Sequence, residues 1–277
     1  MKKAFVIGHP INHSKSPLLH GFWLDKYQID GTYEAIDVAP NELASFLATM
    51  HQNGLVGGNA TIPHKEALPS LCDEATETAK AIGAVNTLYF ERGKLIGDNT
   101  DKYGFLANLD QLAPNWDERK DQAIVLGAGG AARAILVGLI ERGFKNIALL
   151  NRTVERAEAL AKEFQKRSHE TKIVASTLTQ FAKFASNTDF LVNSSAVGMN
   201  GTRFDDLDVA NLPSHATVSD IVYTPLVTPL LADAEKAGLV TVDGLGMLLH
   251  QAVPGFEKWF GVRPEVTDEL RNHILEA

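Results

Sequence analysis

Short apolar runs alternate with longer amphipathic stretches along the chain, and this pattern predicts an α/β protein. The first hundred residues contain both kinds of segment in turn, so parallel sheets with crossover helices are expected. The predicted strands there are Ala4–Gly8, Thr32–Ile36, Gly57–Ala60, Ala84–Phe90 and Lys94–Asn99, and the predicted helices are Leu18–Tyr27, Asn41–Asn53 and Glu74–Ile82.

The middle of the chain repeats the alternation around a glycine-rich turn. An apolar strand at Ile124–Leu126 runs into Gly127-Ala128-Gly129-Gly130-Ala131-Ala132-Arg133, and a helix is predicted over Ala131–Glu141. Gly143 ends that helix, and a second strand follows at Ile147–Leu150. Further strands are predicted at Asp189–Asn193 and Thr217–Val222, and the chain becomes helical after Asp243-Gly244.

This strand, turn and helix resemble the start of a dinucleotide-binding fold. Gly127 suits the tight turn, Gly129 lets the backbone approach a pyrophosphate, and Ala132 takes the position where helix and strand pack closely. The N–H groups that begin the helix then face an anion. Small residues also occur in such turns for packing alone, so the motif depends on its βαβ context.

The end of the second strand predicts which dinucleotide binds. An NAD-binding fold places an acidic residue there, whereas this chain has Asn151-Arg152-Thr153 followed by Arg156. Two guanidinium groups suit a ribose 2′-phosphate, so NADP is the expected cofactor. The alternative is that Arg152 and Arg156 are solvated surface charges at i,i+4 spacing.

More than a hundred residues precede the glycine turn, so a separate first domain is expected. The boundary is expected near Asp101–Asn108 and places residues 1–103 in the first domain. Residues 104–242 then form a doubly wound Rossmann-type domain that binds NADP.

Composition narrows the class of protein. The chain has 277 residues, 45% hydrophobic and 22% charged, with a formal charge of −8 that argues against nucleic-acid or anionic-membrane partners. Cys72 is the only cysteine, which excludes an intrachain disulfide and fits a reducing, cytoplasmic compartment. No apolar run approaches the length of a membrane span, and the apolar part of Met1–Gly8 is too short for a signal peptide.

Three polar segments of the first half carry candidate chemistry. Asn59-Ala60-Thr61-Ile62-Pro63-His64-Lys65 follows a strand, Gly97-Asp98-Asn99-Thr100-Asp101 lies between a strand and a helix, and His13-Ser14-Lys15-Ser16-Pro17 precedes a helix that begins with proline. Each also has a plain interpretation as a helix cap or a surface lysine. Metal binding by His9, His13 and His20 is not expected, because Pro10 prevents a helical i,i+4 pair and no cysteine or acidic ligand is adjacent.

Taken together, these motifs resemble the shikimate dehydrogenase family over nearly the full length. The three segments above, the glycine turn and Asn151-Arg152-Thr153 with Arg156 all match. So do Gly83-Ala84-Val85-Asn86-Thr87 and Asp243-Gly244-Leu245-Gly246-Met247 with Gln251.

The resemblance assigns roles to individual positions. It implies that Lys65 and Asp101 are the catalytic pair. The implied substrate-binding residues are Ser14, Ser16, Asn59, Thr61, Asn86, Tyr223 and Gln251. The implied cofactor-binding residues are Gly127, Ala128, Gly129, Gly130, Ala131, Asn151, Arg152, Thr153, Arg156, Ser195, Ile221, Gly244 and Met247. The resemblance therefore makes residues 1–103 the substrate-binding and catalytic domain. Because Gln251 joins its site, the C-terminal helices of residues 243–277 are expected to return to that domain and complete it.

The activity that the resemblance implies is the reversible, NADPH-dependent reduction of 3-dehydroshikimate to shikimate in aromatic amino acid biosynthesis. The partner is then a small-molecule substrate, and the protein a monomer or homodimer. A quinate/shikimate dehydrogenase that accepts NAD is the nearest alternative, and the two arginines argue against it. A non-catalytic NADP-binding sensor is the alternative from another class, and it would need neither Lys65 nor Asp101.

Overall fold

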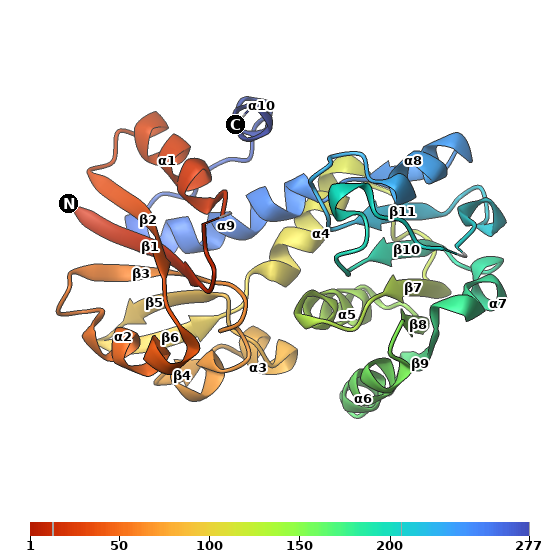
Figure 1. Ribbon diagram of the computed structural model, residues 1–277, viewed down its shortest axis with the longest axis horizontal. Helices are drawn as coiled ribbons and strands as arrows, with labels where there is room; N and C mark the ends of the chain where they lie inside the picture. The colour runs from red at the N-terminus through yellow and green to blue at the C-terminus, as the bar shows by residue number, and fades with distance from the viewer. Residues whose placement is uncertain (13, 206, 277) are drawn as a thin grey trace. The chain divides into compact units, whose positions relative to one another are not determined.

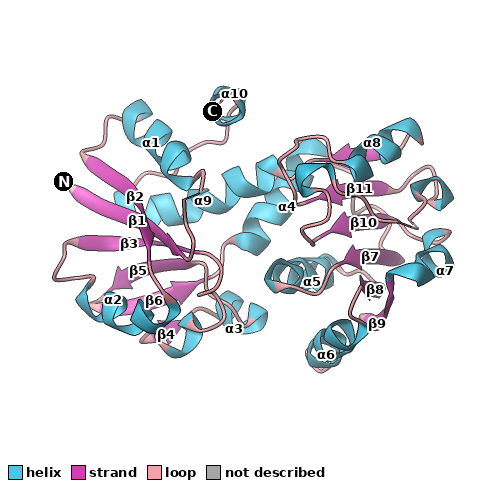
Figure 2. Ribbon diagram, viewed as in Figure 1, coloured by secondary structure: helices cyan, strands magenta, loops and turns pink. Residues whose placement is uncertain are grey.

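Two six-stranded sheets organise the chain in the computed structural model, which describes residues 1–12, 14–205 and 207–276. Each sheet belongs to one compact unit, and helices flank the strands of both (Figures 1 and 2). The first unit contains Met1–Gly104 and Leu249–Ala277, and the second contains Phe105–Leu248. His13, which opens the serine motif, lies outside the described residues.

The first unit is built on a sheet of order β2-β1-β3-β5-β6-β4. Its strands are β1 (Lys2–Gly8), β2 (Gly31–Asp37), β3 (Leu55–Ala60), β4 (Glu74–Ala75), β5 (Thr87–Glu91) and β6 (Lys94–Asp98). Its helices are α1 (Ser16–Lys26), η1 (Pro40–Glu42), α2 (Leu43–Thr49), η2 (Leu68–Ser70), α3 (Glu77–Ile82) and α10 (Asp268–Leu275). Two more helices belong to both units: α4 (Asp101–Leu112) starts in the first, and α9 (Leu245–Phe260) ends in it.

Alternation along β1 gives this sheet two apolar faces. Phe5 and Ile7 pack in a buried cluster with Leu43 and Leu47 of α2. On the other face, the ring of Tyr33 stacks on His20 of α1 at 3.9 Å between centroids. Helix α9 joins that second face, because Trp259 lies 5.8 Å from the Tyr33 ring.

The C-terminal helices therefore return to the first unit, as the sequence predicts. The indole N–H of Trp259 donates to the Leu88 carbonyl of β5 at 2.8 Å, and that of Trp23 donates to the Glu265 carbonyl at 3.1 Å. Lys26 on α1 also pairs with Glu269 on α10 at 2.6 Å.

The second unit is a parallel sheet of order β12-β11-β10-β7-β8-β9. Its strands are β7 (Gln122–Leu126), β8 (Asn146–Asn151), β9 (Lys172–Thr177), β10 (Phe190–Asn193), β11 (Thr217–Asp220) and β12 (Val240–Val242). Its helices are α5 (Gly130–Arg142), α6 (Val154–Gln165), η3 (Leu178–Gln180), α7 (Phe181–Ala185), η4 (Met199–Gly201), η5 (Val209–Asn211) and α8 (Pro229–Lys236). Counted from β7, this is the 3-2-1-4-5-6 order of the Rossmann fold, with its switch point between β7 and β10.

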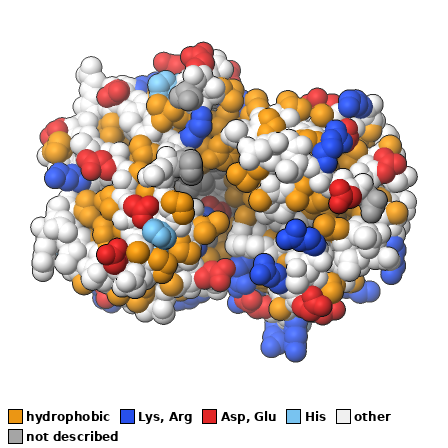
Figure 3. All heavy atoms as spheres, in the orientation of Figure 1, with side chains coloured by type: hydrophobic (Ala, Val, Ile, Leu, Met, Phe, Trp, Pro, Cys, Tyr) orange, Lys and Arg blue, Asp and Glu red, His pale blue; other side chains and the backbone are white. Residues whose placement is uncertain are grey.

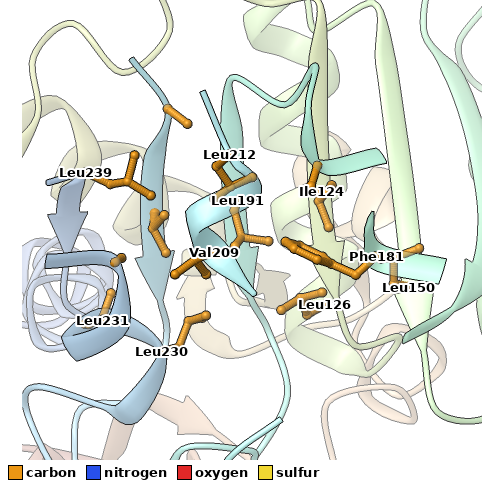
Figure 4. Close-up of a cluster of buried hydrophobic side chains, with 14 of the residues drawn as sticks. Ile124, Leu126, Leu150, Phe181, Leu191, Val209, Leu212, Leu230, Leu231 and Leu239 are labelled. Carbon is orange, nitrogen blue, oxygen red and sulfur yellow. The ribbon is translucent and has the colours of Figure 1, made fainter. Parts of the chain in front are cut away.

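Apolar side chains from both the strands and the crossover segments close the core of this unit. Figure 4 shows Ile124 and Leu126 of β7 beside Phe181 of α7, with Leu191 of β10 next to them. All four side chains are almost completely buried. This packing anchors the strands whose carboxyl ends carry the glycine turn and the loops after β10 and β11.

The first sheet is mixed, so the expectation of parallel sheets throughout was wrong. Strands β5 and β6 are antiparallel, and Glu91 pairs with Lys94 across the turn Arg92-Gly93. Both turn residues have positive φ, 52° and 79°, as a tight hairpin requires. Strand β5 is also antiparallel to β3.

Several predicted boundaries also differ from the structure. The segment Glu74–Ile82 splits into strand β4 and helix α3, because the Thr76 hydroxyl caps the helix by accepting from the Ala79 N–H. The helix expected over Asn41–Asn53 divides into η1 and α2. The strand expected over Ala84–Phe90 begins only at Thr87, and the one expected over Thr217–Val222 ends at Asp220.

The face in Figure 3 carries acidic and basic side chains interspersed with apolar ones. Within the described residues, no helix is both long enough and apolar enough to cross a bilayer.

The close approach of β3 to β1 gives a test of this packing. A Cβ atom at Gly58 would lie 2.3 Å from the Phe5 carbonyl oxygen, so Gly58→Ala should lower the free energy of unfolding by about 1–3 kcal/mol. Gly21→Ala is the control, because Gly21 lies inside α1 with open space around it, and alanine there should add roughly 0.5–1 kcal/mol. Thermal unfolding of both variants checks the prediction, and equal melting temperatures would contradict it.

Candidate active site and dinucleotide turn

A lysine–aspartate pair lies at the centre of the polar residues of the first unit. The Lys65 ammonium donates to Asp101 Oδ2 at 2.7 Å, and the two side chains are 25% and 11% exposed. Lys65 follows β3, and Asp101 begins α4, immediately after the end of β6. Two motifs that are 36 residues apart in the sequence therefore meet in one ion pair.

The Asn86 side chain holds the aspartate from the other side. Its Nδ2 donates to Asp101 Oδ1 at 2.7 Å and lies 3.5 Å from Gln251 Oε1 on α9. Its Oδ1 accepts from the Thr100 N–H at 2.9 Å and from the Thr87 hydroxyl at 2.8 Å. Asn86 is 2% exposed, so its amide has exchanged water for these partners.

The local chain path explains why Asn86 reaches both groups. The Val85 N–H donates to the Lys65 carbonyl at 2.8 Å, and the Asn86 N–H donates to the Asp98 carbonyl at 3.0 Å. These backbone bonds draw the segment before β5 between the two motifs. They also explain why Ala84–Asn86 is a loop, although its residue types suggested a strand.

A second polar chain runs from Asn86 toward α1. Asn59 Nδ2 donates to the Asn86 carbonyl at 3.1 Å, and Asn59 Oδ1 accepts from the Tyr33 hydroxyl at 2.6 Å. Burial raises the pKa of Tyr33 well above its usual value, and hydrogen bonding to Ser16 and Asn59 partly opposes this shift. Tyr33 therefore connects two predicted substrate residues, and it was missed from the sequence because an aromatic residue on a strand is an ordinary core residue.

Ser14, Ser16 and Thr61 are the other predicted substrate residues of the first unit. Ser16 begins α1 and is 8% exposed, and its N–H donates to the Ser14 hydroxyl at 3.3 Å. The Thr61 N–H donates to the Ile7 carbonyl at 2.8 Å, which fixes Thr61 beside the end of β1. His20 is fully buried among aromatic rings, and burial lowers its pKa to about 3.

In the second unit, the glycine turn has the shape that its sequence predicts. Gly127 has φ +103°, and a Cβ atom there would lie 2.9 Å from the Ser194 hydroxyl. Gly129 caps α5, and Ala132 is fully buried. A Cβ atom at Gly129 or Gly130 would instead meet nothing within 4 Å. Packing explains Gly127, whereas the space above Gly129 and Gly130 fits the approach of a phosphate to the first turn of α5.

The residues after β8 present two unpaired cations. Arg152 and Arg156 are exposed, and neither forms an ion pair with any residue that the structure describes. The Asn151 side chain donates to the Thr153 carbonyl at 2.8 Å, and the Arg156 N–H donates to the same carbonyl at 3.2 Å. These bonds shape the start of α6 and leave both guanidinium groups available to a ligand.

The other predicted cofactor residues follow the carboxyl ends of β10, β11 and β12. Ser195 donates its hydroxyl to Asn193 Oδ1 at 2.7 Å. Gly244 packs directly on Ile221, because a Cβ atom there would lie 2.4 Å from the Ile221 carbonyl oxygen. Met247 lies in the first turn of α9 and is partly exposed.

The sequence did not predict one residue that supports this region. Asn108 on α4 donates from Nδ2 to the Asp243 carbonyl at 2.7 Å. Its side chain also covers Gly246, because a Cβ atom at Gly246 would lie 1.8 Å from Asn108 Oδ1. Asparagine inside a helix carries no signal that distinguishes this role.

A first α/β unit with a lysine–aspartate pair and a second unit with a Rossmann glycine turn define a two-domain oxidoreductase of the Rossmann class. Three family models match the chain. They are the shikimate dehydrogenase substrate binding domain at residues 6–88, shikimate / quinate 5-dehydrogenase at residues 110–247, and the shikimate 5′-dehydrogenase C-terminal domain at residues 244–268.

Individual relatives agree with these models. The shikimate dehydrogenase (NADP(+)) of Brucella abortus is 53% identical over 277 residues, which is 99% of this chain and 94% of the relative. The Thermus thermophilus shikimate 5-dehydrogenase, solved with NADP(H) and shikimate, has a TM-score of 0.86 at 35% identity and covers 100% and 99% of the two chains. A quinate dehydrogenase from Corynebacterium glutamicum, solved with NAD, has a TM-score of 0.91 at 29% identity over the full length of both chains. The chain belongs to the shikimate dehydrogenase family.

The two ends of α5 provide a test of the glycine turn. Gly129→Ala should leave the melting temperature nearly unchanged, because a Cβ atom there meets no neighbour. It should weaken the binding of NADP, the dinucleotide named in the Brucella relative, by roughly tenfold, or about 1.4 kcal/mol. Gly143→Ala should lower the melting temperature and leave the NADP affinity nearly unchanged, because Gly143 ends α5 with φ +85°. Calorimetric titration with NADP and thermal unfolding measure both effects. Unchanged NADP affinity in Gly129→Ala would refute a phosphate at this turn.

Proposed function

We propose that this chain catalyses the reversible, NADPH-dependent reduction of 3-dehydroshikimate to shikimate, a step of aromatic amino acid (chorismate) biosynthesis. The observation that carries the proposal is the Lys65–Asp101 pair, held by Asn86 beside Gln251 in the substrate-binding unit. A protein that only sensed the dinucleotide would not need this pair.

The reaction places a defined demand on Lys65. When bound, NADPH supplies the hydride, and reduction of a carbonyl then builds negative charge on its oxygen. The Lys65 ammonium stabilises that charge and donates the proton that completes the hydroxyl group. In the direction of oxidation, a neutral Lys65 accepts the hydroxyl proton.

Asp101 completes the pair by fixing the ammonium. Its Oδ2 accepts from Lys65 while its Oδ1 is bonded to Asn86, so the carboxylate cannot rotate without breaking a charge-assisted bond. We therefore assign Lys65 and Asp101 to proton transfer as one unit.

The substrate is a small anion with several hydroxyl groups, and the polar residues of the site suit both features. We assign the hydroxyl groups of Ser14 and Ser16 to the carboxylate. We assign Asn59, Thr61, Asn86 and Gln251 to the ring hydroxyl groups, because amide side chains both donate and accept hydrogen bonds. Tyr223 of the second unit is assigned to the substrate as well.

NADP binding is assigned to the second unit. Gly127 to Ala131 would receive the pyrophosphate at the start of α5, and Asn151 to Thr153 with Arg156 would hold the adenosine ribose and its 2′-phosphate. Met247 and the Gly244 backbone would line the nicotinamide, and Ser195 and Ile221 are also assigned to the cofactor.

Quinate oxidation and NAD use form the second candidate function. It is favoured by the match to the shikimate / quinate 5-dehydrogenase model and by the TM-score of 0.91 to a quinate dehydrogenase solved with NAD. Steady-state oxidation of shikimate and of quinate, each with NADP and with NAD, separates the candidates. The proposal expects the highest kcat/KM for shikimate with NADP, and a higher value for quinate with NAD would overturn it.

We further propose that the enzyme acts in the cytoplasm as a monomer or homodimer. Burial raises the pKa of the Cys72 thiol to about 11, which suits an inert cysteine. The formal charge of −8 supports a small-molecule substrate as the partner, with neither nucleic acid nor membrane involved.

Lys65→Ala should reduce kcat for shikimate oxidation by at least roughly a hundredfold, because proton transfer is lost. The shikimate dissociation constant should stay within a few-fold of the wild-type value, because the contacts to the carboxylate and hydroxyl groups remain. Stopped-flow and equilibrium titrations measure the two quantities. Lys80→Ala is the control, since Lys80 forms an exposed pair with Glu77 on α3. Near-normal turnover of Lys65→Ala would rule out its catalytic role.

Arg152→Ala combined with Arg156→Ala should raise KM for NADP by about two to four decades, if each guanidinium contributes about 1.5–3 kcal/mol to the 2′-phosphate. The effect on KM for NAD should be small, because NAD lacks that phosphate. Steady-state kinetics with both cofactors measures the difference. Equal effects on the two KM values would identify the arginines as surface charges.

A further inference from the structure

A buried carboxylate at the end of β11 has no role in the function described so far. Asp220 is 0% exposed, and no lysine, arginine or histidine of the described chain forms an ion pair with it. Its partners are three neutral donors: Asn193 Nδ2 at 2.8 Å, the Val222 N–H at 2.9 Å and the Thr228 hydroxyl at 2.7 Å. Burial raises the pKa of Asp220 to about 6. The three bonds satisfy the carboxylate without a cation and join three separate positions of the chain.

The first donor connects Asp220 to the loop after β10. Asn193 gives one amide hydrogen to Asp220 and another to the Val197 carbonyl at 2.7 Å. Its Oδ1 accepts from both the N–H and the hydroxyl of Ser195, at 2.9 and 2.7 Å. The conformation of Ser195 therefore depends on an amide that Asp220 orients.

The other donors fix the segment after β11. The Val222 N–H bond turns the chain out of the strand one residue before Tyr223. Thr228, at the other end of the segment, donates to the carboxylate and accepts from the Leu231 N–H as the N-cap of α8. Both ends of the short segment 221–228, which carries Tyr223, are thus attached to the same carboxylate.

These bonds lie at the carboxyl ends of the strands, where the glycine turn also begins. Asn193 pairs with Leu126 of β7 on one side and with Asp220 on the other. The Ser194 N–H and hydroxyl both donate to the Leu126 carbonyl, the first at 2.8 Å and the second also at 2.8 Å. Asp220 therefore acts where the loops from three adjacent strands meet.

We propose that Asp220 is a positioning residue for the reaction, which holds the Ser195 loop and the Tyr223 segment in one arrangement through Asn193, Val222 and Thr228. The proposal rests on the assignment of Ser195 to the cofactor and Tyr223 to the substrate in the proposed function. A displacement of about 1 Å at such groups costs up to roughly a hundredfold in rate, so the three bonds should be visible in kinetics.

The same sheet provides a matched control at the amino ends of its strands. Asp189, 6% exposed, lies just before β10 and also has three donors: the Asp121 N–H at 2.8 Å, the Gln122 N–H at 3.1 Å and His215 Nε2 at 2.9 Å. Its bonds join the amino ends of the strands and contact no predicted site residue. Asp189→Ala therefore reports the effect on stability alone.

The first experiment compares Asp220→Ala, Asp220→Asn and Asp189→Ala in shikimate oxidation with NADP, with melting temperatures measured in parallel. Asp220→Ala should lower kcat/KM by roughly 10- to 100-fold. Asp220→Asn should stay within about threefold of the wild type, because its oxygen still accepts from Asn193 and Val222 and its amide can donate to Thr228. Asp189→Ala should lower the melting temperature and keep kcat/KM.

The second experiment asks whether Asp220 acts through Tyr223. Tyr223→Phe is measured in the wild type and in Asp220→Ala. The loss in kcat/KM should be several-fold smaller in the second background, because Tyr223 is already displaced there. If Asp220→Ala does not fold, Asn193→Ala replaces it in the first experiment, since it removes the amide that joins Asp220 to Ser195. Thr228→Val replaces it in the second experiment, since it removes the hydroxyl that attaches the far end of the Tyr223 segment to Asp220. The expectations are the same.

The outcomes separate this proposal from the proposed function. A wild type that does not oxidise shikimate with NADP refutes the proposed function itself, and the positioning role with it. Normal wild-type turnover with a full effect of Tyr223→Phe in both backgrounds, or with Asp220→Ala no worse than Asp189→Ala, refutes the positioning role alone.

Discussion

The site of the first unit depends on one buried amide, the side chain of Asn86. It donates to the Asp101 carboxylate at 2.7 Å and accepts from the Thr100 N–H, just before α4. Its backbone carbonyl accepts from the Ala60 N–H at 2.8 Å and from the Asn59 side chain at 3.1 Å. Removing one partner from such a network leaves a buried donor or acceptor unpaired, at a cost of about 1–3 kcal/mol. The network therefore specifies one arrangement of Lys65 and Asp101.

The glycine turn of the second unit presents backbone groups instead of side chains at the start of α5. Phosphate recognition needs N–H groups at a helix start and room for a ligand above them. The turn after β7 provides both, because Gly127 is required by its neighbours and Gly129 and Gly130 leave the start of α5 open. At the same end of the sheet, Asp220 attaches the loops after β10 and β11 to one carboxylate.

The local motifs could be predicted from the sequence because each is a contiguous run with its own geometry. The glycine turn, the two-domain α/β fold and the return of the C-terminal helices were confirmed. The mixed order of the first sheet was not predicted, since strand direction depends on tertiary pairing and only the short turn Arg92-Gly93 signals the hairpin. Tyr33, Asn108 and Asp220 were missed for a related reason, because their roles come from partners distant in sequence. The roles assigned to individual site residues remain predictions.

We propose that Lys65 and Asp101 act as a single proton-transfer unit. The most direct test is a double-mutant cycle in kcat for shikimate oxidation with NADP, comparing Lys65→Ala, Asp101→Ala and the double variant. If the pair acts as one unit, either single change removes nearly all of the effect and the double variant is little slower than the slower single variant. Losses that multiply in the double variant would show two independent contributions and contradict the account.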